Sequence, residues 1–234
     1  MYFKEASMFK NLMSFWKGKD FLKEILKDFQ QMMDDAQDMF RVSCDLIIRD
    51  KKKEEGAKDN IYRIDKRIND LERTIRTRIV EHLSLQPEID LPFSLVLMSV
   101  VKDAERLGDY AKNMFGILEL TQKPFDRDIY RKLFDDIDTK LTAQFEKTKQ
   151  AFLESDEQLA HDILNLERNI VRRCDTIVAE LANSDMSANK AVCFTLMARY
   201  FKRVSAHLAN IGSSVILPIS DLDFFDEKFR HNHY

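Results

Sequence analysis

Two carboxylates on one stretch of this 234-residue chain are the first candidates for chemistry. Glu105 and Asp109 are four residues apart, so on an α-helix their side chains project from the same face. Asn113 continues this row by one more turn, and Asn69 and Glu72 lie on an earlier stretch that is expected to face it. Oxygen donors of this kind bind hard or borderline cations, so the pattern predicts a site for Mg²⁺, Mn²⁺, iron or Zn²⁺.

The same spacing is also common on helices whose polar face simply meets water. Arg106 lies within the row, so a solvated face is the alternative interpretation of Glu105 and Asp109. The sequence contains no nucleophile elbow, P-loop or H-E-x-x-H motif. It also lacks the E-x-x-H pairs of ferritin-like di-iron sites. We therefore expect a protein that is not an enzyme.

Glycine and proline are scarce, with five and four residues in the whole chain. This is about a third of the usual share in globular proteins. Sheet-rich folds need these residues at their turns, so the composition excludes most barrels, sandwiches and Rossmann-type domains. A hydrophobic share of 44% and a charged share of 33% suit helices with one apolar and one polar face.

The charge balance and the cysteines narrow the class of protein further. A formal net charge of −3 argues against a dedicated nucleic-acid binder, which normally has a strongly basic face. Cys44, Cys174 and Cys193 include no C-x-x-C pair and are expected to be buried free thiols in a reducing cytoplasm. No stretch has the apolar density of a transmembrane helix. Lys10 and Asn11 interrupt the start before a signal sequence can form. We expect a cytoplasmic protein.

Apolar residues recur at helical spacing along six stretches of the chain. In the first, from residue 21 to about residue 53, the intervals alternate between three and four residues, which predicts a heptad seam on a long helix. The third helix is expected to begin near Pro92, after a connection over residues 86–91, and the fifth to open with a capping box at residues 155–158. The seam consists of Leu22, Ile25, Phe29, Met32, Ala36, Met39, Ser43 and Leu46.

The six stretches form two copies of a three-helix unit. Residues 68–75 match residues 163–170 at an offset of 95, and residues 106–113 match residues 203–210 at an offset of 97. We therefore expect an all-α fold of two tandem three-helix bundles, with long antiparallel helices and pseudo-twofold symmetry. The predicted units are an N-terminal extension (1–19), a first repeat (20–122), a second repeat (123–219) and a C-terminal tail (220–234).

The N-terminal extension stands outside the repeats. Its apolar residues, among them Phe9, Leu12 and Trp16, can line one face of a helix, and lysines flank them. Such a segment is suited to contact a partner protein or an anionic membrane surface. The alternative is that it packs across the first bundle as a cap.

Three motifs of this sequence carry a resemblance to a known family: Ile68-Asn69-x-Leu71-Glu72, then Gln86-Pro87 with Asp90-Leu91, and above all the stretch from Glu105 to Asn113. With these motifs, the two-repeat arrangement resembles the PhoU family of phosphate-uptake regulators over about residues 21–218. The resemblance implies that the E-x-x-x-D carboxylates bind metal. It also implies a phosphate transporter and a sensor histidine kinase as partners, with a position at the inner face of the membrane. A homodimer is a further expectation, from exposed Phe and Met residues.

Two departures from the family pattern stand out. Pro92 replaces an arginine that is usual in the family. In the second repeat, Lys202 and Ala206 occupy the positions that match Glu105 and Asp109. An ammonium group at a cation site is repulsive, so no metal is expected in the second repeat.

The favoured hypothesis is a non-enzymatic regulator of phosphate uptake and of phosphate-starvation signalling, acting through its partners. Two alternatives stay open on the residues alone. One is a helical metal-binding protein whose carboxylates carry the function. The other is a generic helical adaptor with no phosphate role.

Overall fold

The computed structural model describes residues 20–48, 56–85, 87–121 and 125–222. Within these ranges the chain forms seven α-helices, one 3₁₀ turn and no strand, which confirms the all-α prediction. The elements are α2 (Asp20–Ile48), α3 (Ala57–Leu85), α4 (Pro87–Leu120), α5 (Arg127–Phe134), α6 (Ile137–Glu154), α7 (Glu157–Ala182), α8 (Ala188–Ser213) and η1 (Ile219–Asp221).

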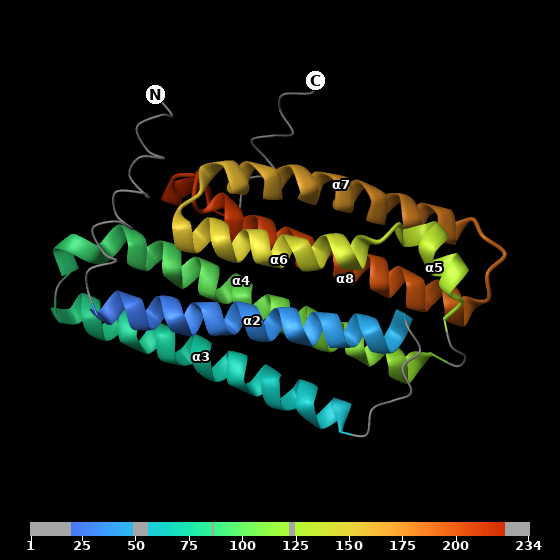
Figure 1. The fold of residues 1–234 in the computed structure, drawn as a ribbon, viewed down its shortest axis with the longest axis horizontal. Coiled ribbons are helices and arrows are strands. Elements are labelled where there is room, and N and C mark those ends of the chain that lie inside the picture. The colour runs from blue at the N-terminus through green and yellow to red at the C-terminus, as the bar shows by residue number, and fades with distance from the viewer. Residues whose placement is uncertain (1–19, 49–55, 86, 122–124, 223–234) are drawn as a thin grey trace.

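The helices lie roughly along one direction and form an elongated body (Figure 1). Helices α2, α3 and α4 contact one another, and α6, α7 and α8 form the corresponding second set. The two sets meet where α4 packs on α8 and α2 packs on α6. In Figure 1, α3 and α7 lie on opposite outer sides of this arrangement. The predicted pair of three-helix repeats is therefore present, joined along inner helices.

The heptad seam of α2 explains how the repeats share one core. All eight seam positions are buried, from Leu22 to Leu46, as the alternating spacing predicts. Phe40, also on α2, packs its ring 5.7 Å from that of Phe145 on α6 and 5.9 Å from that of Phe201 on α8. Aromatic contacts at this range stabilise beyond the area they bury. The core is therefore continuous from one repeat to the other.

The third helix begins earlier than predicted. Helix α4 starts at Pro87 and contains Pro92 in its interior, so residues 87–91 belong to the helix rather than to a connection. Proline suits the first helical position because its missing N–H would have no helical partner there. The missing N–H of Pro92 removes one backbone bond from the second turn, which the helix tolerates.

The predicted fourth helix is broken into α5 and α6. Asp135 and Asp136 at the break have φ angles of 46° and 58°, in the left-handed region that aspartate adopts more readily than most residues. The backbone N–H of Asp135 donates to the carbonyl of Arg131 and closes α5. Apolar spacing continues across the break, so the sequence pattern did not reveal it.

The N-cap of α7 lies one residue later than the predicted capping box placed it. Asp156, not Ser155, is the N-cap of α7, and its side chain accepts a hydrogen bond from the backbone N–H of Leu159 at 2.9 Å. Ser155 instead ends α6 in the left-handed conformation, with φ of 56°. One residue cannot both end α6 in this way and cap α7, because an N-cap residue has extended backbone angles.

Two further expectations can be compared with the structure, and a third falls outside the residues that it describes. Cys44, Cys174 and Cys193 are buried free thiols, as predicted. Among the residues that the structure describes, no helix is long and apolar enough to cross a membrane. The extension over residues 1–19 and most of the C-terminal tail lie outside the described residues, and so do Phe9, Leu12 and Trp16.

Candidate functional site

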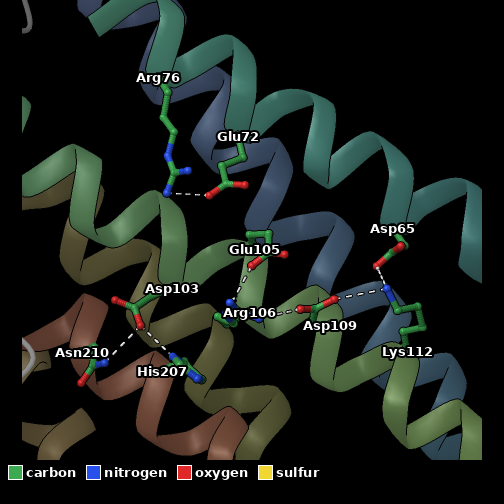
Figure 2. A network of polar contacts seen from close by, with 10 residues as sticks. All are labelled: Asp65, Glu72, Arg76, Asp103, Glu105, Arg106, Asp109, Lys112, His207 and Asn210. Carbon is green, nitrogen blue, oxygen red and sulfur yellow. Dashed lines mark hydrogen bonds and ion pairs between the residues drawn. The ribbon is translucent and has the colours of Figure 1, made fainter. Parts of the chain in front are cut away.

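The predicted acidic residues lie in a row of ion pairs between α3 and α4 (Figure 2). The Nζ atom of Lys112 is 2.7 Å from Asp65 on α3 and 3.2 Å from Asp109 on its own helix. Arg106 is 3.0 Å from the other carboxylate oxygen of Asp109 and 3.6 Å from Glu105. Cations and carboxylates thus alternate along the row.

Helices α3 and α4 approach closely beside this row because Gly108 has no side chain. A Cβ atom at Gly108 would lie only 2.8 Å from Cδ1 of Ile68 on α3, well inside normal van der Waals contact. Gly108 sits between Glu105 and Asp109 in the sequence. The glycine of the motif therefore brings the acidic face of α4 close to α3.

Glu105 is a partly buried carboxyl group with other carboxylates near it. Burial raises the pKa of its carboxyl group above the ordinary value, and the neighbouring Asp109 and Glu72 raise it further. Arg106 and Lys112 oppose this shift. Glu72 in turn pairs with Arg76 at 2.8 Å. A carboxylate that is partly buried among other carboxylates is stabilised by any added positive charge.

The structure brings together three of the five residues that the sequence proposed as ligands. Asp109 and Glu72 both lie close enough to Glu105 to raise the pKa of its carboxyl group. Asn113 is exposed on α4 and Asn69 is half-buried on α3. Neither asparagine makes a hydrogen bond to the acidic row among the contacts of the described residues.

The donor types fit a cation, but the side chains are arranged as ion pairs. Within the described residues, no group of three His, Cys, Asp or Glu side chains is placed to hold a metal ion. Both oxygens of Asp109 are engaged, one by Lys112 and one by Arg106. A cation bound here would have to displace at least one of these two basic side chains.

The second repeat has the charge distribution that its sequence predicts. Lys202, which matches Glu105 at the offset of 97, places its Nζ atom 2.6 and 2.8 Å from the two carboxylate oxygens of Asp175 on α7. The ammonium group thus occupies the position where the first repeat has a carboxylate. Ala206 supplies no ligand at the position that matches Asp109.

A second polar network, between the repeats, was not predicted as a unit. Asp103 on α4 accepts hydrogen bonds from Nδ1 of His207 at 2.7 Å and from Nδ2 of Asn210 at 3.1 Å, both on α8 (Figure 2). The His207 ring stacks on Tyr110 at 5.5 Å, and Tyr110 lies 6.1 Å from Tyr200. The partners are about a hundred residues apart, so no local sequence pattern links them.

Comparison with known proteins agrees with this architecture. The PhoU domain matches residues 29–117 and again residues 134–215. A phosphate-specific transport system accessory protein PhoU homolog from Clostridium acetobutylicum is 22% identical over 176 residues, which cover 72% of this chain and 80% of that protein.

Two solved structures have the same fold. The crystal structure of PhoU from Pseudomonas aeruginosa superposes with a TM-score of 0.72 at 22% identity, over 84% of this chain and 95% of that one. The phosphate transport system regulatory protein PhoU from Streptococcus pneumoniae gives a TM-score of 0.69 at 16% identity, over the same shares. Because the PhoU domain matches twice and spans well over half of the residues, this chain belongs to the PhoU family.

Proposed function

We propose that this protein regulates phosphate uptake by binding subunits of a phosphate transporter and a sensor histidine kinase. The observation that carries the proposal is the PhoU domain match over both repeats. The similarity to an accessory protein of a phosphate-specific transport system supports it. As a member of the PhoU family, the chain is a regulatory protein and not an enzyme.

The shape of the molecule suits this role. Helices α3 and α7 form the outer sides of the elongated body (Figure 1), and we propose that their outward faces contact other proteins. A regulator changes the activity of a partner only if it binds one conformation of that partner more tightly than another. We propose that the bound state is favoured when phosphate is plentiful and that it represses uptake, at the cytoplasmic face of the membrane.

The test is deletion of the gene in its own organism, with phosphate uptake and expression of phosphate-starvation genes as readouts. We expect both to become insensitive to plentiful phosphate, and the intact gene to restore the response. Unchanged uptake and expression would contradict the proposal and favour a generic helical adaptor. Co-purification of the tagged protein with transporter and kinase subunits tests the proposed partners directly.

We propose, in addition, that Glu105 and Asp109 bind a divalent cation in the first repeat. Support comes from the raised pKa of Glu105, whose carboxyl group is destabilised as an anion by burial and by Asp109 and Glu72. A cation relieves this repulsion if it displaces Lys112 or Arg106 from Asp109. Mg²⁺, Mn²⁺, iron and Zn²⁺ are the candidates, since carboxylate oxygens alone select poorly among them.

Titration of the metal-free protein with each ion, followed by calorimetry, tests this site. The double variant Glu105→Gln with Asp109→Asn is expected to lose binding. Asp70→Asn is the matched control, because Asp70 is an exposed acid on α3 that pairs with Arg73 away from the row. Equal binding by the wild-type protein and the double variant would contradict the site, as would loss of binding in the control.

A further inference from the structure

Four large apolar side chains are exposed at one end of the first repeat, and we call them the end patch. Val80 and Leu85 on the last part of α3 are 57% and 83% exposed. Leu91 and Leu95 on the first part of α4 are 47% and 46% exposed. Because α4 follows directly after α3, the four residues lie at the same end of the bundle (Figure 1). Single exposed leucines are ordinary, but a group at one end indicates a surface that something covers.

The end patch continues toward the second repeat. The short element η1 contacts α4, and its Ile219 is a further exposed apolar residue, at 37%. Acidic residues stand next to these apolar residues along the chain, and we call them the acidic border. Glu81 is exposed on α3 next to Val80, and Asp221 lies in η1 two residues after Ile219. The chemistry of the occupant should therefore be apolar at its centre and basic around it.

We propose that residues 1–19 of the same chain cover the end patch. Residue 19 is joined to Asp20, the first residue of α2. Helix α2 begins at the end of the bundle where α3 ends and α4 begins (Figure 1). Nineteen residues span about 28 Å even as a helix, which is enough to cross the ends of several packed helices. The segment is thus tethered beside the patch and long enough to reach all of it.

The sequence of residues 1–19 has the chemistry that the patch requires. Phe9, Leu12 and Trp16 recur at intervals of three and four residues, which places them on one face of a helix. The same nineteen residues contain four lysines and a single acidic residue, Glu5. The lysines complement the acidic border at Glu81 and Asp221. An anionic membrane, in contrast, is repelled by an acidic border.

Cross-linking between introduced cysteines tests the contact. The full-length variant Leu12→Cys with Leu95→Cys is treated with a short bifunctional maleimide under native conditions. The native cysteines need not be removed, because all three are buried, and burial raises the pKa of Cys174 to about 12. The wild-type protein serves as the check that they do not react.

The matched control is Leu12→Cys with Val192→Cys. Val192 is 53% exposed and lies near the start of α8, at the opposite end of the molecule from the end patch (Figure 1). We expect an intramolecular cross-link in the variant with Leu95→Cys and none in the variant with Val192→Cys. No cross-link in the variant with Leu95→Cys, or equal yields in both, would overturn the proposal. A covalent dimer would overturn it too and identify a second copy of the chain as the occupant.

Deletion of residues 2–19 gives an independent readout. The shortened protein is expected to bind more of a hydrophobic fluorescent dye than the full-length protein. Adding Leu91→Glu and Leu95→Glu to the shortened protein should abolish the additional dye binding, because the two substitutions remove apolar side chains of the end patch. Unchanged dye binding after the deletion would contradict the proposal. Binding to anionic vesicles is a second measurement. If the full-length protein binds such vesicles and the shortened protein does not, the proposal is contradicted, because residues 1–19 would then contact lipid.

Discussion

The Nδ1 atom of His207 lies 2.7 Å from Oδ1 of Asp103. This contact joins α4, the third helix of the first repeat, to α8, the last helix of the second repeat. The Asp103 side chain is 9% exposed and that of His207 is 17% exposed. The same carboxylate oxygen also accepts from Asn210. A buried carboxylate with two donors holds its partners strongly, since the loss of one member leaves the others unsatisfied.

Asp103→Ala should lower the free energy of unfolding by about 1–3 kcal/mol, because His207 and Asn210 lose their acceptor. Urea denaturation measures the change. Lys102→Ala, at the exposed neighbouring position, is the control and should have little effect. The double variant with His207→Ala should be less destabilised than the sum of the single variants. Strict additivity would contradict the coupling of these two residues.

Phe40→Ala should lower the free energy of unfolding by about 3–5 kcal/mol, since a fully buried aromatic ring is removed. Its ring contacts Phe145 and Phe201 in the second repeat. The loss should therefore appear in both repeats at once, as a single shifted transition. Hydrogen exchange followed by mass spectrometry checks this. Faster exchange confined to α2, α3 and α4 would show that the repeats unfold independently.

Gly108→Ala should destabilise the protein by about 1 kcal/mol or more, because the new Cβ atom would meet Ile68 at 2.8 Å. Gly116→Ala on the same helix is the matched control. No atom lies within 4 Å of a Cβ atom there, so alanine should stabilise α4 by up to about 1 kcal/mol. Thermal unfolding of both variants measures these changes in stability. The same sign of change in both would contradict close packing of α3 on α4 at Gly108.

Glu105→Gln should stabilise the protein at pH 7. The folded state raises the pKa of Glu105 above 4.5, chiefly by burial, so ionisation of this group opposes folding. That cost is fully present above the folded-state pKa and disappears as the pH falls through it. The advantage of glutamine should therefore shrink as the medium is acidified. Urea denaturation at pH 7 and pH 4 measures it, and a larger advantage at pH 4 would contradict the assigned environment.

The junction of α6 and α7 gives a pair of opposite effects. Asp156→Ala should cost about 1 kcal/mol, because the N–H of Leu159 loses its cap. Ser155→Gly should be neutral or stabilising, since glycine adopts the left-handed conformation without strain. Thermal unfolding checks both variants. If Ser155→Gly destabilises the protein and Asp156→Ala has no effect, Ser155 is the cap of α7, as the predicted capping box at residues 155–158 requires.

Local periodicity was sufficient for much of the fold. The seam from Leu22 to Leu46 was read from spacing alone and is buried throughout. The scarcity of glycine and proline excluded most sheet-rich folds, and the stretch from Glu105 to Asn113 pointed to the PhoU family. The seam could be predicted because the buried face of an amphipathic helix consists of apolar residues three and four positions apart.

The register between helices was decided only by tertiary packing. The sequence match pairs Glu72 with Glu167, yet the residue that contacts Lys202, the match of Glu105, is Asp175. Likewise Ile163, the match of Ile68, lies against Gly212. Asp175 lies eight residues after Glu167, and Gly212 lies seven residues after Ser205, the match of Gly108. A shift of about two helical turns leaves an apolar stripe in nearly the same place, so the sequence alone does not distinguish such registers.

Contacts between distant parts of the chain were also beyond the sequence. The bond between Asp103 and His207, and the pairing of Lys112 with Asp65, depend on how whole helices lie against each other. Thus the sequence by itself determined which residues are buried within each helix and which family the chain resembles. The tertiary structure alone decided which charges meet, because those distances are set by the packing of helices far apart in the chain.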